Sequence, residues 1–214
     1  MAILTRGLLS PTGISGRIGN LVYFTRRGKQ YVRALPKKRS RKISKLQMIH
    51  REHFRLVTQC LSGFTPLFNI GFQHPREKMT AYNYAVSYAC KHALTGKFPD
   101  TRLDFSKMLF TCGPLSQAYQ PKAESMGHES IRFSWQYKNW GPYHGNDRAV
   151  LIAVCEDPLV FFFTHAQVPR ISELGFLHTP GMTGKKLHTY IGFVNASGKK
   201  AADSVYTGEL TLAP

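Results

Sequence analysis

The residues best suited to chemistry in this 214-residue chain are cations and aromatic side chains near its start. Guanidinium and ammonium groups neutralise phosphates, and aromatic rings such as those of Tyr23, Phe24 and Tyr31 stack on exposed bases. The spacing therefore predicts a polyanion-binding site. Its members are Tyr23, Arg26, Arg27, Lys29, Tyr31, Arg33, Lys37, Lys38, Arg39, Arg41 and Lys42.

The placement of charge supports this prediction. The chain carries a formal net charge of +17, and the residues up to Arg55 include 14 lysines and arginines but one acidic residue, Glu52. Such asymmetry indicates a polyanionic partner, which is nucleic acid, an acidic polysaccharide or an anionic surface. The alternative that the sequence leaves open is a solvated basic arm without a specific partner.

The sequence offers little for catalysis. Its 12 acidic residues show no pairing typical of general acid–base chemistry, and its nine histidines are scattered. His144 and Asp147 share a turn-rich loop with Trp140 and Tyr143, but aromatic loops of this kind more often bind or pack. Neither a nucleophile elbow nor a His-Glu-x-x-His motif is present. We therefore predict a non-enzymatic protein with no catalytic residue, no cofactor and no metal.

Two further patterns favour structural roles. His50 and His53 lie about one helical turn apart, but no third metal ligand stands close to them in the sequence. Gly13, Gly16 and Gly19 recur every third residue, as in phosphate-binding loops. They lead into a β-prone run instead of a helix, and no Gly-Lys-Ser/Thr ending follows. The glycines therefore predict a bend in which backbone approaches backbone.

Cysteine usage and hydropathy bear on the compartment. The four cysteines are widely spaced and include no Cys-x-x-Cys pair, which favours buried free thiols. Arg6 interrupts the first apolar run, unlike the core of a signal peptide. No stretch approaches the roughly 18 apolar residues of a membrane helix. We expect a cytoplasmic protein without a membrane partner.

The elements that must position the basic residues are strands. Residues 21–24 and 31–33 are β-prone, and Gly28 between them provides the positive φ of a tight hairpin turn. Ser44 and Gln47 form a capping-box pattern. Helical spacing of apolar residues follows it and predicts helices at 45–61 and about 79–94, with a short helical fragment within 64–72.

After residue 100 the helical spacing gives way to β-branched and aromatic runs separated by turn residues. Strands are predicted near residues 102–109, 122–125, 131–136, 149–155, 160–165, 175–177, 187–196 and 204–212. This number of short strands is typical of a β-sandwich. Ile131, Phe133 and Trp135 alternate with polar residues, so one face of their strand is predicted to be buried, with Trp135 in the core.

Two resemblances extend this interpretation. The segments FSW (133–135) and GKKLHTYIGFVNASGKKAADSVYTG (184–208) resemble a fibronectin type III or other immunoglobulin-like domain. The whole chain resembles a bacterial family of unknown function and similar length. The matching segments are GISGRIGNLVYFTRRGKQYVRALPK, the helix segment NYAVSY and the strand segment YIGFV. The resemblance implies no activity, cofactor or catalytic residue.

The predicted fold class is therefore α+β. An N-terminal β-hairpin and two or three helices (residues 1–100) precede an antiparallel immunoglobulin-like β-sandwich (residues 101–214). The predicted function is non-enzymatic binding or assembly, with nucleic acid or another polyanion held by the basic N-terminal third. The alternative is a structural component that binds protein partners through the sandwich. The sequence leaves the oligomeric state open.

Overall fold

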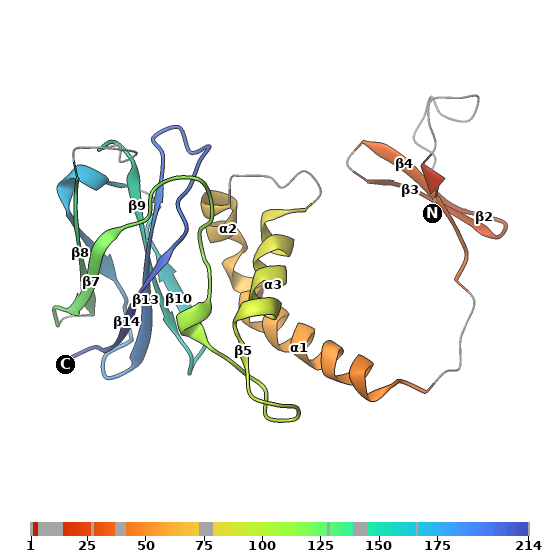
Figure 1. Cartoon of the computed structure of the whole chain (residues 1–214), viewed down its shortest axis with the longest axis horizontal. Helices are drawn as coiled ribbons and strands as arrows, with labels where there is room; N and C mark the ends of the chain where they lie inside the picture. Colours follow the sequence, from red (N-terminus) through yellow and green to blue (C-terminus); the bar gives the residue numbers. More distant parts are fainter. Residues whose placement is uncertain are drawn as a thin grey trace. The chain divides into compact units, whose positions relative to one another are not determined.

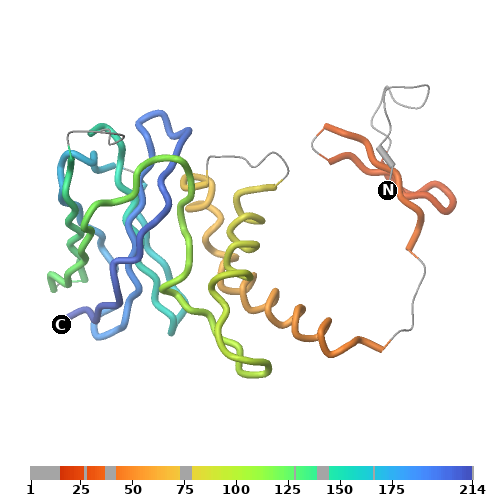
Figure 2. The backbone as a smooth tube through the Cα atoms, in the orientation of Figure 1, coloured from red at the N-terminus to blue at the C-terminus, as the bar shows by residue number. Residues whose placement is uncertain are grey.

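The computed structural model describes residues 2–3, 15–26, 28–36, 42–72, 79–127, 129–138, 145–165 and 167–213. Figure 1 shows the helices and strands, and Figure 2 shows the path of the backbone. The chain divides into two compact units, Met1–Ile43 and Ser44–Pro214, which are described separately.

The first unit is an antiparallel four-stranded sheet with strand order β1-β4-β3-β2. Its strands are β1 (Ala2–Ile3), β2 (Gly16–Ile18), β3 (Leu21–Arg26) and β4 (Lys29–Ala34). Gly28 has a φ of 72° between β3 and β4, and Gly19 has a φ of 57° between β2 and β3. The predicted hairpin is confirmed. Gly16 begins β2 and Gly19 lies in the turn before β3, but a Cβ at either position would meet no atom within 4 Å, so the predicted close approach of backbone is wrong at these two glycines. The pairing of β1 and β2 with the hairpin was not predicted.

The second unit begins with helices. They are α1 (Lys45–Leu61), η1 (Ser62–Phe64), α2 (Thr65–Gly71) and α3 (Ala81–His92). The predicted capping box is present, because Ser44 Oγ accepts the Gln47 N–H at 3.3 Å and Gln47 Oε1 accepts the Ser44 N–H at 3.2 Å. Thr80 caps α3 in the same manner by accepting the Asn83 N–H at 3.2 Å. The three predicted helical segments are thus confirmed.

The remaining elements are mostly strands. They are β5 (Leu94–Thr95), β6 (Arg102–Leu103), η2 (Phe105–Lys107), β7 (Tyr119–Ser125), β8 (Ser130–Gln136), β9 (Arg148–Cys155), β10 (Val160–Phe163), β11 (Val168–Pro169), η3 (Arg170–Ser172), β12 (Leu174–His178), β13 (Lys186–Val194) and β14 (Val205–Thr211). The strand predicted over 102–109 is wrong after Leu103. Asp104 Oδ1 accepts the Ser106 N–H at 3.1 Å and starts a 3₁₀ turn there. The other seven predicted strands are present, and β11 was not predicted.

These strands form two principal antiparallel sheets. The helices add a third layer. One sheet has the order β10-β9-β13-β14 with β11 also paired to β9, and the other has the order β12-β8-β7. Along β9, Val150, Ile152 and Val154 pack into a core shared with the helices. Leu151 and Ala153 pack toward the three-stranded sheet. Figure 1 shows the helices beside the sheet that contains β9, β10 and β13. The predicted α+β class with an antiparallel sandwich is confirmed.

The helices and the sandwich share one core. Val57 of α1 and Phe68 of α2 belong to the same buried cluster as Ile152 and Tyr190 of the sheet. For this reason the compact units divide after residue 43. The boundary predicted at residue 100 follows the change from helices to strands. Its role as a limit of independent folding stays a prediction.

The predicted core tryptophan is confirmed, since Trp135 is 3% exposed and packs edge-on against Phe193 at 5.6 Å between ring centroids. The alternation of buried and exposed residues along β8 also matches the prediction. Within the described ranges, no helix combines the length and apolar character needed to cross a bilayer.

Candidate polyanion-binding face

Strand register decides which side chains share a face of the N-terminal sheet. Opposed residues of an antiparallel pair project to the same side, and successive residues of one strand project to opposite sides. Arg26 pairs with Lys29, and Phe24 pairs with Tyr31. Val22 pairs with both Arg33 and Arg17. One face, here called the basic face, therefore carries four cations and two aromatic rings. Its charged and aromatic members are Arg17, Phe24, Arg26, Lys29, Tyr31 and Arg33, and Val22 lies on the same face.

The aromatic pair lies at the centre of the basic face. The Phe24 and Tyr31 rings stack with centroids 5.5 Å apart and planes 15° apart. The guanidinium carbon of Arg33 lies 5.9 Å from the Phe24 centroid, within the range of a cation–π contact. Arg26, Lys29 and Arg33 are exposed, so their charges stay in water.

Carboxylates are missing from this part of the sequence. No acidic residue precedes Glu52, so no carboxylate of the first unit can neutralise the basic face. Across the described residues, every ion pair joins residues numbered 52 or higher. No histidine precedes His50 either, so the charge of this face is constant between about pH 5 and 8.

The opposite face of the sheet is apolar. Ile18 and Leu21 oppose each other, and Tyr23 opposes Val32. Ile18 is 58% exposed and Leu21 is 41% exposed. The sequence prediction placed Tyr23 and Tyr31 in one site, and the register corrects this, because Tyr23 projects to the apolar face.

The other predicted members are distributed as follows. Lys42 is exposed and lies in the segment that precedes α1. Five predicted members fall outside the described residues, namely Arg27, Lys37, Lys38, Arg39 and Arg41. The prediction omitted Arg17, which the three-residue strand β2 places beside Val22.

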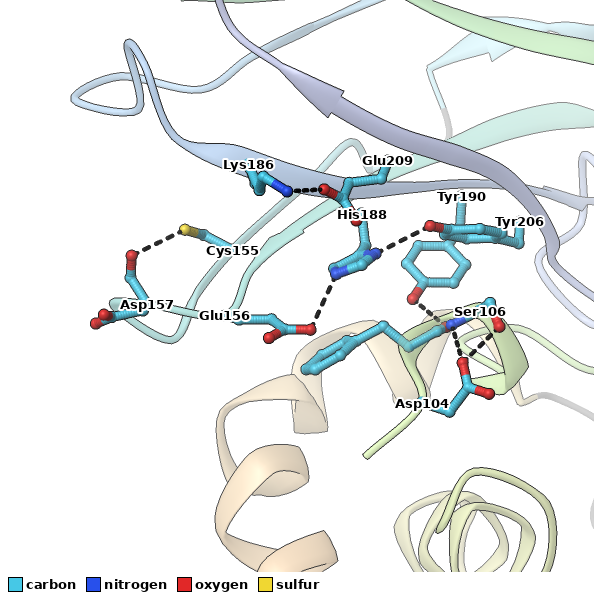
Figure 3. A network of polar contacts seen from close by, with 11 residues as sticks. Asp104, Ser106, Cys155, Glu156, Asp157, Lys186, His188, Tyr190, Tyr206 and Glu209 are labelled. Atoms are coloured by element: carbon cyan, nitrogen blue, oxygen red, sulfur yellow. Dashed lines mark hydrogen bonds and ion pairs between the residues drawn. The ribbon is translucent and has the colours of Figure 1, made fainter. Parts of the chain in front are cut away.

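A second polar cluster surrounds His188 in the second unit, as Figure 3 shows. Its Nδ1 lies 3.0 Å from the Tyr206 hydroxyl, and its Nε2 lies 3.0 Å from Glu156 Oε1. The Phe105 ring stacks on the imidazole with centroids 4.9 Å apart. Because both ring nitrogens and one ring face are engaged, this cluster joins β9, β13, β14 and η2 as a structural network. This network could not be predicted from local sequence, since 32 residues separate Glu156 from His188.

Nearby ion pairs shift titrations in the same region. Lys186 Nζ lies 2.8 Å from Glu209 Oε1, and this contact lowers the pKa of Glu209 and raises the pKa of Lys186. Burial raises the pKa of Tyr206, so its hydroxyl stays protonated beside His188. Lys186, His188 and Glu209 border a cavity of about 380 Å³ together with Cys155 and Asp157. Lys186 and Glu209 thus neutralise each other, and their contact stabilises the charged forms of both side chains.

The predicted aromatic loop contributes one described residue. Trp140, Tyr143 and His144 lie outside the described residues. Asp147 is 2% exposed, and its Oδ2 lies 3.4 Å from Nη2 of Arg170. Its carboxylate therefore neutralises a buried guanidinium.

Arg170 has further partners inside the second unit. It donates to the carbonyl oxygens of Ser116 at 2.7 Å and Gln117 at 3.2 Å. Its guanidinium carbon lies 3.7 Å from the Phe193 ring centroid. A buried charge must be paired in this manner to be tolerated, so Arg170 and Asp147 stabilise the fold.

The described residues give little support for a metal site or a reactive thiol. His53 Nε2 lies 3.3 Å from Thr101 Oγ1. Of the residues that the structure describes, no three His, Cys, Asp or Glu side chains are grouped to hold a metal. All four cysteines are free, as the sequence indicated, and Cys60 and Cys155 are buried. Burial raises the pKa of the Cys60 thiol to about 11, which keeps it unreactive at neutral pH.

These features define an α+β protein with a small basic sheet and a β-sandwich covered on one side by helices. The chain belongs to the Family of unknown function (DUF6266), whose model matches residues 13–208. The family resemblance that the sequence indicated is confirmed at this level. No curated protein matches the chain.

The solved structures that are similar to this chain include the following two. The fn3 domain of human collagen alpha-1(XX) chain is 14% identical, with 46% of this chain and 86% of that chain covered, at a TM-score of 0.34. The FN1–FN3 domains of chicken CNTN1 are 10% identical, with 48% of this chain and 33% of that chain covered, also at a TM-score of 0.34. Both agree with the fibronectin type III resemblance, and neither carries an argument about function.

Proposed function

We propose that this chain is a binding protein that holds a polyanion, nucleic acid above all, against the basic face of its N-terminal sheet. The observation that carries the proposal is the gathering of Arg17, Arg26, Lys29 and Arg33 on one face, within a segment free of carboxylates. Arginine and lysine contacts to phosphates supply most of the affinity of non-specific nucleic-acid binding.

The spacing along β4 suits a single strand of nucleic acid. Lys29, Tyr31 and Arg33 project to the same face, and residues four apart in a strand are separated by about 13 Å. A bound strand would therefore meet a charge, an aromatic ring and a second charge in turn. Aromatic rings between cations provide stacking that tolerates any base sequence.

The test is fluorescence anisotropy with labelled single-stranded DNA and RNA across a series of salt concentrations. We expect the logarithm of the affinity to fall linearly with the logarithm of salt. Replacing Arg17, Arg26 and Arg33 together by Gln removes three phosphate contacts, and the slope should then decrease by about 2.

The matched control removes three exposed lysines of the second unit by the changes Lys185→Gln, Lys199→Gln and Lys200→Gln. It alters the net charge equally but leaves the basic face intact, so affinity and slope should stay near those of the unmodified chain. Equal losses in the two triple variants, or affinity that does not respond to salt, would contradict the proposal.

A second candidate function is protein binding through the sandwich. Strand β12 lies at the edge of its sheet and exposes Leu174 and Phe176, which are 41% and 54% exposed. Sheet edges with apolar side chains bind extended segments of other chains. Light scattering over a range of concentrations tests self-association. A chain that remains monomeric and captures no protein partner would count against this candidate.

We also propose that the chain has no catalytic activity and works in the cytoplasm. Four free cysteines suit a reducing compartment, which supports this location. Fractionation of the host cell, with detection of the chain in the extracellular or membrane fraction as the contrary outcome, tests it.

A further inference from the structure

A cavity of about 380 Å³ that the proposed function does not use lies in the second unit, at the start of α3. Its walls come from the end of α2, the start of α3 and two loops. They include Phe72, Met79, Tyr84, Cys112, Pro114 and Asp203. This volume lies in the range of pockets that hold small ligands or single side chains.

One wall of the cavity carries the carboxylate of Asp203. Asp203 Oδ1 accepts the Gly113 N–H at 3.0 Å, and among the described residues no lysine, arginine or histidine forms an ion pair with it. A carboxylate offers about four acceptor sites, so this single backbone bond leaves capacity for a donor.

Two aromatic rings stand in the same cavity wall. The Phe72 and Tyr84 rings have centroids 5.6 Å apart and planes tilted by 59°, so they form a corner. The Tyr84 backbone N–H donates to Thr80 O at 3.0 Å, which places Tyr84 on the first turn of α3. Aromatic faces attract cations, and an adjacent carboxylate adds to this attraction.

We infer that this pocket binds an alkylguanidinium group, presented as an arginine side chain by an extended protein segment. The guanidinium donates hydrogen bonds to Asp203, and its plane lies against Phe72 or Tyr84. Guanidinium suits this site better than ammonium because it is planar, is weakly hydrated and both stacks and forms paired hydrogen bonds with a carboxylate. Exposed Thr80 and Pro114 at the cavity edge let the group enter from solvent.

The test uses N-acetyl-arginine methylamide as the probe and the neutral citrulline analogue as its control. Binding is followed by the amide signal of Gly113 in ¹⁵N-resolved NMR spectra. It is also followed by the rate at which iodoacetamide alkylates Cys112, measured by mass spectrometry. The arginine probe should shift the Gly113 signal and slow alkylation of Cys112, and the citrulline analogue should do neither. Cys90, outside the cavity wall, serves as the internal reference thiol.

The decisive variant is Asp203→Asn, which keeps an oxygen acceptor for the Gly113 N–H but removes the charge. It should weaken probe binding about tenfold, since a hydrogen bond to a charged group is lost. Asp100→Asn removes the same charge from an exposed turn and should leave binding unchanged. Unchanged affinity in Asp203→Asn, or equal binding of the citrulline analogue, would overturn the inference.

Two additional measurements define the source of the group and separate this site from the basic face. Tighter binding of the capped arginine than of methylguanidine supports a protein segment, and equal binding shows that the occupant is a free guanidinium compound. Oligonucleotide affinity should be the same in Asp203→Asn and the unmodified chain. The two sites can therefore fail independently.

Discussion

Arg33 and Arg170 both lie over phenylalanine rings, and their surroundings are opposite. Arg33 is exposed, 5.9 Å from the Phe24 centroid, in a unit without carboxylates. Arg170 is 2% exposed, 3.7 Å from the Phe193 centroid, and paired with Asp147. A cation with internal partners stabilises a fold, whereas a cation without them is available to a ligand. The comparison separates structural charge from charge that serves binding.

The same contrast holds for packing. Among the described residues, no side chain of the first unit is buried, whereas two buried clusters fill the second unit. A sheet of this size gains little from burial and is marginally stable alone. Surface chemistry is therefore less constrained by packing in the first unit than in the second.

The largest expected effect comes from dividing the second unit. A fragment of residues 101–214 would expose the cluster that Ile152 and Tyr190 share with the helices, so we expect it not to unfold cooperatively. A fragment of residues 44–214 should keep the unfolding midpoint of the intact chain. Circular dichroism during heating measures both. Equal midpoints for the two fragments would instead support a domain boundary at residue 100.

Removing a buried, paired cation should lower the free energy of unfolding more than removing an exposed cation. Arg170→Ala leaves the Asp147 carboxylate buried without its partner, and we expect a loss of about 3–5 kcal/mol in the free energy of unfolding in urea. Arg132→Ala breaks an exposed pair with Glu124 and should cost at most about 1 kcal/mol. Similar losses of stability in the two variants would show that the buried Arg170 is no more important to the fold than an exposed arginine.

Acid should affect the second unit. Bonds from Lys107, Arg132 and Lys186 lower the pKa values of Asp104, Glu124 and Glu209 respectively. Groups with lowered folded pKa values stabilise a protein above their unfolded pKa, and this contribution is lost as pH falls through the folded value. The urea midpoint should therefore fall between about pH 5 and pH 3.

Oligonucleotide affinity gives the contrasting measurement. It should be constant between about pH 5 and 8, because no histidine precedes His50 in the sequence. Affinity that rises steadily as histidines become protonated would place binding in the second unit, where all nine histidines lie.

The smallest expected effect on stability is that of Arg33→Gln. This change removes one exposed charge and leaves the sheet register intact, so the free energy of unfolding should change by less than about 0.5 kcal/mol. Oligonucleotide affinity should nevertheless decrease. A variant that binds normally but unfolds readily would show that Arg33 is structural.

Local signals in the sequence predicted most of the elements. The capping box of Ser44 and Gln47 located the start of α1, and alternation along β8 located Trp135 in the core. The sequence could also have shown that Tyr23 and Tyr31 project to opposite faces. A two-residue turn between Arg26 and Lys29 sets the register of the hairpin.

Contacts between distant residues were not accessible. Gly113 bonds to Asp203, and Glu156 bonds to His188, only because strands far apart in the sequence become neighbours. Local pattern carries no information on these pairs. The cavity lined by Asp203 and the cluster around His188 could therefore be found only from the tertiary structure. The turn at Asp104 was missed because a side-chain bond to the backbone outweighed the strand propensity of its neighbours.

The position of Arg170 affects how the sandwich opens. Its side chain contacts the segment before β7 and the ring of Phe193 on β13, and its carbonyl oxygen accepts the Trp135 Nε1–H from β8 at 2.7 Å. If one sheet separated from the other, the buried guanidinium of Arg170 would lose its hydrogen-bonding and ring partners while still shielded from water. Amide hydrogens in the centres of both sheets should therefore exchange with solvent in a single concerted event.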